Sequence, residues 1–148
     1  MIRLFNDDCL SVLHSQTFFD LTKDKQVVIV TDPPFNIGYH YGKYKDDMDE
    51  EAYYEWLAEI LLNYPAVVIH YAEPLFKLSF QIDRFPEKVV SWVYNSNTAK
   101  QHREIAFFDI KPDFNLVRQP YKNPTDKRIA ERIARGCRGG EIIRLVEC

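Results

Sequence analysis

The stretch VVIVTDPPF at residues 27–35 decides the expected fold and the candidate site together. Its first half is a run of β-branched residues, which is typical of a strand buried on both faces, as in a parallel sheet; we predict this strand over Gln26 to Thr31. Two prolines then end the strand, because they lack the backbone N–H that a ladder or a helix needs. Asp32 and the residues after it are therefore expected at the carboxyl end of a buried strand, where open α/β sheets bind their ligands.

Strand-like and helix-like patterns alternate along the rest of the chain. We predict further strands at Ile2 to Phe5, Ala66 to Tyr71, Val89 to Tyr94 and Ile105 to Ile110. We predict one helix directly after a cap at Asp7-Asp8. Three more helices are predicted from Asp49 to about Asn63, from Pro74 to about Phe80 and from Asp126 to Arg135. The stretch Asn36 to Asp49 carries glycines and charges and predicts a mobile loop. This order predicts an α/β fold with a mostly parallel sheet and an antiparallel edge.

Length and composition limit the kind of protein. The 148 residues fit one domain, 1–148, and the apolar runs are far shorter than the roughly 20 residues that a membrane helix needs. We expect a cytoplasmic protein with no membrane partner, because the N-terminus also lacks a signal pattern. Three cysteines and four histidines lack metal-ligand spacing, so we expect no metal site.

Charge is distributed unevenly. The net charge is −3, which is unusual for a nucleic-acid binder. Residues 1–60 hold twelve acids against five bases, whereas the segment 100–138 holds ten bases against five acids. This basic C-terminal segment is a candidate footprint for phosphates, and a solvated helix face is the alternative interpretation.

The residues that follow the predicted strand suit a flat ligand with an amino group. The carboxylate of Asp32 can accept one N–H, and the Pro33 carbonyl, held rigid beside Pro34, can accept another. Phe35 offers a flat apolar face on which an extruded nucleobase could stack. Such contacts would favour the tetrahedral nitrogen that develops when an exocyclic amine is methylated. A simple turn is the alternative, since Asp and Pro are common in turns.

Asp32-Pro33-Pro34-Phe35-Asn36 resembles the catalytic motif of amino-group DNA methyltransferases, which use S-adenosylmethionine as the methyl donor. The leading Asp is more frequent in the adenine-specific families, so the resemblance implies adenine. The segment 6–10 is similar to the Gly-Asp-Cys-Leu opening of members whose catalytic motif comes first, although Asn6 replaces the glycine; by alignment, Asp8 would contact the cofactor. Segments 92–98 and 119–128 also look like phage and prophage-type methylases. The resemblance covers almost the whole chain and implies a partial Rossmann-like methyltransferase fold.

The cofactor motif of those methyltransferases has no counterpart in this sequence. In that family order, a target-recognition region and then Asp-Pro-Phe with a glycine-rich turn come near the C-terminus, whereas Gly139-Gly140 follow basic residues here. We expect the chain to be the N-terminal portion of a methyltransferase with poor affinity for S-adenosylmethionine. Its expected partners are DNA and either a second chain carrying the cofactor motif or another copy of itself, paired through an exposed sheet edge.

Further candidates for DNA contact are aromatic, basic or polar. Loop residues could clamp a flipped base or its flanking phosphates, and a disordered loop is the alternative. Arg103, beside Gln101 and His102 at a strand start, could contact DNA or belong to an ordinary exposed polar cluster. The candidate set for substrate or DNA binding is Asn36, Tyr39, Tyr41, Lys43, Lys45 and Arg103.

Three functional hypotheses follow from the sequence. The first is methyl transfer to the exocyclic amine of adenine in DNA. The second is a catalytically silent remnant, or half of a split methyltransferase that needs a second chain. The third is a protein-glutamine methyltransferase, whose similar motif typically begins with Asn; Asp32 and the wider resemblance disfavour it. The DNA recognition sequence cannot be predicted, because the region that would read base edges has no counterpart here.

Overall fold

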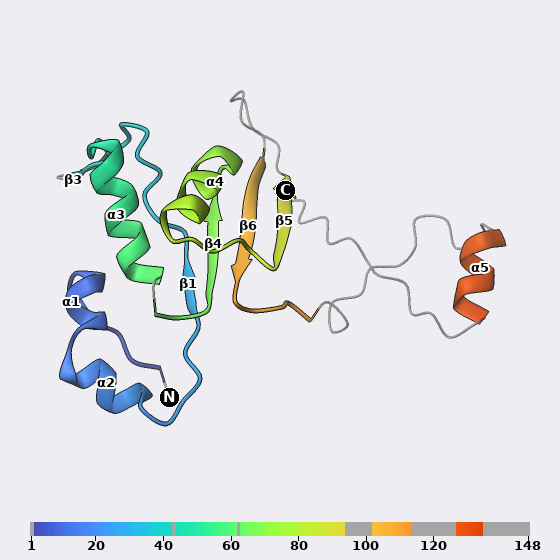
Figure 1. Ribbon diagram of the computed structural model, residues 1–148, viewed down its shortest axis with the longest axis horizontal. Helices are drawn as coiled ribbons and strands as arrows, with labels where there is room; N and C mark the ends of the chain where they lie inside the picture. Colours follow the sequence, from blue (N-terminus) through green and yellow to red (C-terminus); the bar gives the residue numbers. More distant parts are fainter. Residues whose placement is uncertain (1, 43, 62, 94–101, 114–126, 135–148) are drawn as a thin grey trace. The chain divides into compact units, whose positions relative to one another are not determined.

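A mixed sheet and the helices packed on it make up most of what the structure describes. The computed structural model describes residues 2–42, 44–61, 63–93, 102–113 and 127–134 (Figure 1). Its helices are α1 (Cys9–Leu13), α2 (Gln16–Thr22), α3 (Glu50–Leu61), α4 (Ala72–Gln81) and α5 (Lys127–Ala134). Its strands are β1 (Ile29–Thr31), β2 (His40–Tyr41), β3 (Tyr44–Lys45), β4 (Ala66–His70), β5 (Lys88–Val93) and β6 (His102–Phe108). The chain divides into two units, 1–91 with 103–111, and 92–102 with 112–148.

The four-stranded sheet has the order β1-β4-β6-β5. β1 and β4 are parallel and are joined through α3, whereas β4 and β6 are antiparallel. The predicted α/β class and the antiparallel pairing are confirmed, but the prediction of a mostly parallel sheet is wrong. The reason is that only eight residues separate β5 from its neighbour β6 in the sequence, fewer than the dozen or more that a parallel crossover needs. The described strand pairs include one parallel pair, β1 and β4, so the Rossmann-like part of the prediction is not clearly met.

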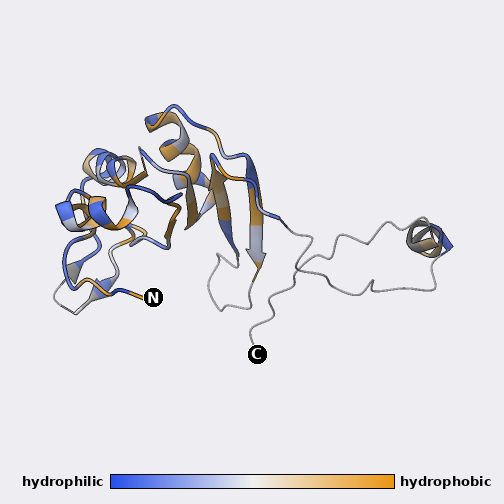
Figure 2. Cartoon of the chain, turned by 90° about the horizontal axis from the view of Figure 1, so that it is seen from below, coloured by the Kyte–Doolittle hydropathy of each residue, from blue (hydrophilic) through white to orange (hydrophobic). Residues whose placement is uncertain are grey.

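The core lies between one face of this sheet and the helices α3 and α4. Along β4, Ala66, Val68 and His70 are buried, whereas the residues between them are only half-buried. The β6 partners of the first two, Phe108 and Ala106, are fully buried as well. Figure 2 colours β4 and the later part of β6 largely hydrophobic, whereas β6 begins with hydrophilic residues. The rest of the core comes from the helices and one residue after them: Tyr53, Leu57, Ile60 and Leu61 from α3, Leu75 and Leu78 from α4, and Ile82 directly after α4.

The first strand of the sheet differs from its prediction. β1 spans only Ile29–Thr31, and Val30 is 70% exposed, so the run is not buried on both faces. The reason is its place at the edge of the sheet, where the face opposite α3 and α4 is only partly covered by described residues. The predicted strand at Ile2 to Phe5 is wrong. These residues are not in a strand, and Ile2 and Leu4 are 90% and 94% exposed.

The helices agree better with the sequence, because caps mark their starts. The Asp8 carboxylate accepts the N–H groups of Leu10 and Ser11 at the start of α1, and Asp49 accepts that of Glu51 at the start of α3. α2, which Ser15 caps, was not predicted. In the second unit, α5 confirms the helix predicted at Asp126 to Arg135 to within about one residue. No helix among the described residues is both long and apolar enough to cross a membrane.

Candidate active site

Three segments meet at one edge of the sheet. Asp32 follows β1, and Tyr71 follows β4; because these strands are parallel, their carboxyl ends lie at the same edge. β6 runs the other way, so Arg103, near its start, reaches this edge too. The predicted location of the motif, directly after a strand of an α/β sheet, is therefore confirmed. Pro33 is buried within the motif, whereas the side chain of Asp32 is 48% exposed.

The buried carboxylate of Asp46 holds the segment after the motif. Asp46 is 1% exposed, and its two oxygens accept the backbone N–H groups of Asn36 at 2.9 Å and Ile37 at 3.2 Å. The Asn36 amide donates to the Met48 carbonyl at 2.9 Å, and Asn36 has a left-handed backbone with φ 54°. This network fixes how the chain leaves Phe35. Asn36 was predicted to bind DNA, but its backbone N–H and its amide NH2 are used to fold the loop.

A tyrosine and a histidine from the core hold the second proline of the motif. The Tyr53 hydroxyl lies 2.7 Å from the Pro34 carbonyl and 2.9 Å from His70 Nε2. The Tyr71 N–H donates to His70 Nδ1 at 2.8 Å, so in a neutral ring the proton sits on Nε2. His70 therefore donates to Tyr53, and Tyr53 donates to Pro34. Both hydrogen bonds therefore point toward the carbonyl of Pro34, the residue after Pro33.

Aromatic rings and a cation surround Phe35. Its ring centroid lies 4.7 Å from that of His70 and 5.1 Å from that of Tyr71. The guanidinium carbon of Arg103 lies over the Phe35 ring, 4.6 Å from its centroid. The same guanidinium forms an ion pair with Asp32, with 3.6 Å between Nη1 and Oδ2. The structure thus brings Arg103, which the sequence assigned to the site separately, onto two residues of the motif, Asp32 and Phe35.

The segment predicted as a mobile loop contains a hairpin instead. β2 and β3 pair across Gly42, whose φ of 66° suits glycine, and backbone hydrogen bonds join Asp46 to Gly38 and Tyr39. Tyr39 is 60% exposed, and Lys45 is exposed too. Lys43 and the side chain of Tyr41 lie outside the described residues, so the predicted clamp is described only in part.

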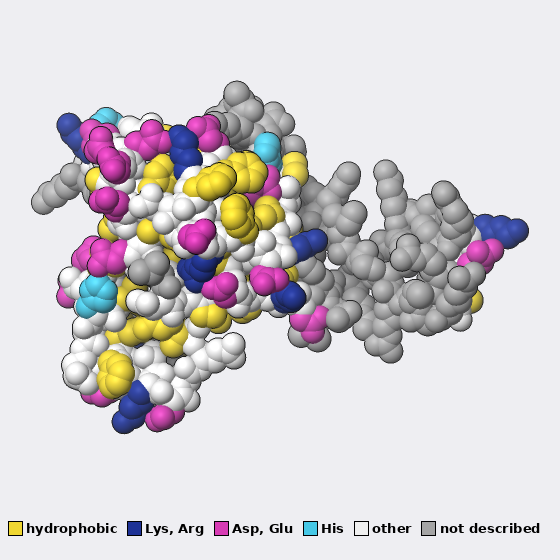
Figure 3. All heavy atoms as spheres, viewed as in Figure 1, with side chains coloured by type: hydrophobic (Ala, Val, Ile, Leu, Met, Phe, Trp, Pro, Cys, Tyr) yellow, Lys and Arg dark blue, Asp and Glu magenta, His cyan; other side chains and the backbone are white. Residues whose placement is uncertain are grey.

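A segment rich in acidic side chains follows the described part of this hairpin in the sequence. The exposed acids Asp47, Asp49, Glu50 and Glu51 follow directly after Lys45 in the sequence. Figure 3 shows a group of acidic side chains at this end of the molecule. A phosphate near Lys45 would meet their repulsion, so the geometry favours Lys45 less than Tyr39 as a contact for a nucleic acid.

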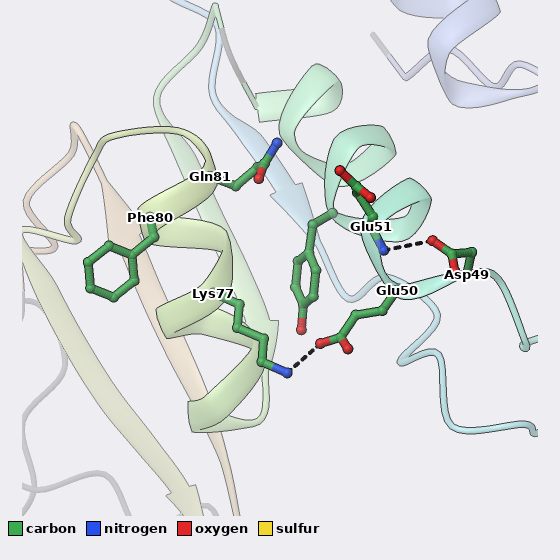
Figure 4. A pocket seen from close by; sticks show the side chains of 7 residues that line it. Asp49, Glu50, Glu51, Lys77, Phe80 and Gln81 are labelled. Atoms are coloured by element: carbon green, nitrogen blue, oxygen red, sulfur yellow. Dashed lines mark hydrogen bonds and ion pairs between the residues drawn. The ribbon is translucent and has the colours of Figure 1, made fainter.

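An open pocket of about 580 Å³ lies between the start of α3 and α4 (Figure 4). Its lining residues are Asp49, Glu50, Glu51, Tyr54, Lys77, Phe80 and Gln81. Lys77 bonds to Glu50 and lies 3.1 Å from Glu73, and these hydrogen bonds raise the pKa of Lys77 above its ordinary value. The cation already has two carboxylate partners, and no residue predicted for the site lines this pocket. Its geometry gives it no role in the candidate site.

Asp8 serves a structural purpose in the described contacts. Its carboxylate caps α1, and Leu10 and Leu13 of this helix pack on the core. The contact with a cofactor that the resemblance implied stays a prediction.

Replacing Asp8 by alanine is expected to lower the free energy of unfolding by about 1 kcal/mol, because two N–H groups of α1 lose their acceptor. Urea denaturation measures this loss. Asp8→Asn is the matched control, since asparagine caps a helix about equally well without a charge. A loss as large in Asp8→Asn as in Asp8→Ala would contradict the capping role.

Three residues that hold the motif were not identified from the sequence as site residues: Asp46, Tyr53 and His70. Tyr53 fits the apolar pattern of α3, and with 2% exposure it lies in the core. His70 carried one usable signal. His70 ends β4, which pairs in parallel with β1, and β1 leads directly into Asp32. His70 and the motif therefore lie at the same edge of the sheet. Asp46 had no such signal, because its role depends on how the hairpin folds back.

Among the described residues, no three potential ligands gather into a metal site. No protein-family model matches the sequence. A segment of 60 residues is 37% identical to the Type II methyltransferase M.MjaVI of Methanocaldococcus jannaschii, covering 40% of this chain and 27% of that protein. The match thus spans about a quarter of the length of that relative. This similarity relates part of the chain to a methyltransferase.

Proposed function

We propose that this chain supplies the base-binding part of an S-adenosylmethionine-dependent DNA methyltransferase that acts on the exocyclic amine of adenine. Asp32 and the Pro33 carbonyl accept the two hydrogens of the amine, and Phe35 stacks on the extruded base. The similarity to a Type II methyltransferase supports the reaction class. The choice of adenine rests on the leading Asp32 of the motif.

The observation that carries the proposal is the rigid support around these acceptors. Tyr53 fixes the Pro34 carbonyl, Asp46 fixes the two N–H groups that follow Phe35, and the Asp32 carboxylate remains 48% exposed. Acceptors held in place before the reaction stabilise a transition state without paying for reorganisation. A simple turn would need neither a buried carboxylate nor a buried tyrosine–histidine pair.

The described residues do not fit the cofactor. Their only glycines, Gly38 and Gly42, lie in the segment 36–49 around the β2/β3 hairpin and not after an apolar strand, so neither offers the close backbone approach that the methionine part of S-adenosylmethionine needs. Asp8 is used as a helix cap. We therefore propose that cofactor binding requires a partner surface beyond the described residues.

Exposed aromatic residues of α4 and the turn after it support such a partner. Phe76, Phe80 and Phe85 are 64%, 74% and 63% exposed, and Figure 3 shows hydrophobic side chains gathered over α4. The Phe80 and Phe85 rings contact each other edge to face, with 5.8 Å between centroids. An apolar group of this kind gains free energy when another protein surface covers it.

The base-binding part of the proposal is tested by the affinity of the chain for two single-stranded oligonucleotides, oligodeoxyadenylate and oligothymidylate. Thymine has no exocyclic amine, so the chain should prefer the adenine strand by about tenfold, and Asp32→Ala should remove that preference. Phe35→Ala should weaken both strands about tenfold, because base–aromatic stacking does not depend on sequence. Fluorescence anisotropy with labelled strands measures these affinities.

Asp20→Ala is the matched control for Asp32→Ala, because it removes one exposed acid on α2. It should leave the adenine preference unchanged. Equal binding of both strands by the unaltered chain would overturn the proposal.

Incubation with radiolabelled S-adenosylmethionine and DNA separates the three functional hypotheses. We expect no label transfer by the chain alone, and transfer once a chain carrying the Asp-Pro-Phe and glycine-rich motif is added. Transfer by the 148 residues alone would refute the need for a partner. Label on protein instead of DNA would favour the glutamine methyltransferase.

A further inference from the structure

Arg103 takes up both of the contacts that the proposed base needs. Its guanidinium lies over the Phe35 ring, with 4.6 Å from its carbon to the ring centroid. Its Nη1 lies 3.6 Å from Asp32 Oδ2. The arginine comes from β6, and β4 separates β6 from β1 in the sheet. Its side chain therefore crosses the end of β4 to reach both motif residues.

A guanidinium group and the amino edge of adenine share the relevant chemistry. Both are flat and delocalised, both present N–H donors in the plane, and both bind well to a carboxylate and to an aromatic face. The carboxylate and ring of Asp32 and Phe35 therefore suit either group. They cannot hold both at once, since the guanidinium lies on a face of Phe35 that a stacked base would need.

We propose that Arg103 is a placeholder for the target base, which must displace it to bind. This inference rests on the proposed function, because it concerns the regulation of the same site. While Arg103 is in place, it neutralises Asp32 and covers the Phe35 ring, and the site is closed to bases. When a base enters, its amine replaces the guanidinium at Asp32 and its ring replaces it on Phe35.

The contacts of Arg103 with Asp32 and Phe35 are weak enough for a base to displace them. The side chains of Arg103 and Asp32 are 27% and 48% exposed, so water weakens their ion pair. A partly exposed cation over a phenyl ring adds a similarly small amount. Together they lower base affinity by about fivefold, which favours closure yet lets a bound strand reverse it.

The proposal reverses the effect expected of an ordinary DNA-binding arginine. If Arg103 gripped a phosphate, its removal would weaken binding; if it competes with the base, its removal tightens binding. We therefore compare the affinities of Arg103→Ala, Arg103→Lys and Lys111→Ala for labelled oligodeoxyadenylate by fluorescence anisotropy. Lys111 is the matched control for the loss of one positive charge, because its side chain is 80% exposed and pairs only with Glu87 in the described contacts.

Arg103→Ala is expected to bind about fivefold more tightly than Lys111→Ala. Arg103→Lys should lie between them, because lysine keeps the charge beside Asp32 but lacks the flat group that stacks. Circular dichroism of each variant establishes that it is folded, and the lysine variant replaces the alanine variant in the comparison if the latter unfolds.

Two results would overturn the placeholder, and they differ from each other. Equal or weaker binding by Arg103→Ala than by Lys111→Ala would overturn it while leaving the proposed function intact, provided that binding still depends on Asp32 and Phe35. Binding that ignores Asp32 and Phe35, or no binding by any variant, would overturn the proposed function and the placeholder with it.

Discussion

Asp46→Ala is expected to lower the free energy of unfolding by about 3 kcal/mol. The substitution removes a buried carboxylate whose oxygens accept the N–H groups of Asn36 and Ile37. A buried donor left without an acceptor costs about 1–3 kcal/mol, and here two part-buried donors lose their acceptor together. Urea denaturation measures the change. Amide hydrogen exchange locates it, because the Asn36 and Ile37 amides should exchange faster than expected from the global loss alone.

Asp47→Ala is the matched control for Asp46→Ala. Asp47 is the next residue along the chain and is exposed, so its removal should change the free energy of unfolding by no more than about 0.5 kcal/mol. If both variants lost the same small amount, the hydrogen bonds of Asp46 would not be what holds the motif in place.

The sequence predicts the elements well where local chemistry decides them. Asp8 and Asp49 mark helix starts because a carboxylate can satisfy first-turn N–H groups in any tertiary context. The run before Asp32 predicts a strand for a similarly local reason. Its burial was predicted wrongly, because the exposure of Val30 depends on β1 being an edge strand, and strand order is a property of the whole sheet.

The residues of the site also fall into two groups, those with a local sequence signal and those whose role depends on the tertiary fold. Asp32, Pro33 and Phe35 can be identified from a contiguous motif and its place after a strand. Their supports come from distant positions: Asp46 lies ten residues from Asn36, and Tyr53 lies nineteen residues from Pro34. Arg103 was a candidate for contact with DNA, and only the antiparallel return of β6 reveals that it lies on the motif itself.

Tyr53→Phe is expected to lower the free energy of unfolding by about 2 kcal/mol. Removal of one oxygen deletes the hydrogen bonds that the Tyr53 hydroxyl makes with His70 Nε2 and with the Pro34 carbonyl, while the ring and its packing remain. Tyr54→Phe is the control on the same helix. Tyr54 lines the pocket beside Lys77, and loss of its hydroxyl should cost no more than about 0.5 kcal/mol.

A stability loss alone would not separate positioning from packing, so the same variant is tested for ligand preference. Tyr53 holds the carbonyl next to that of Pro33, so Tyr53→Phe should reduce the preference for oligodeoxyadenylate over oligothymidylate even at temperatures where it is fully folded. Ile60→Ala is the control for destabilisation, because it truncates a buried side chain of α3 at a cost of about 2–4 kcal/mol without touching Pro34. An equal change of preference in both variants would show that Tyr53 acts through general stability. A change confined to Tyr53→Phe would show that Tyr53 positions the Pro33 carbonyl that accepts the amine.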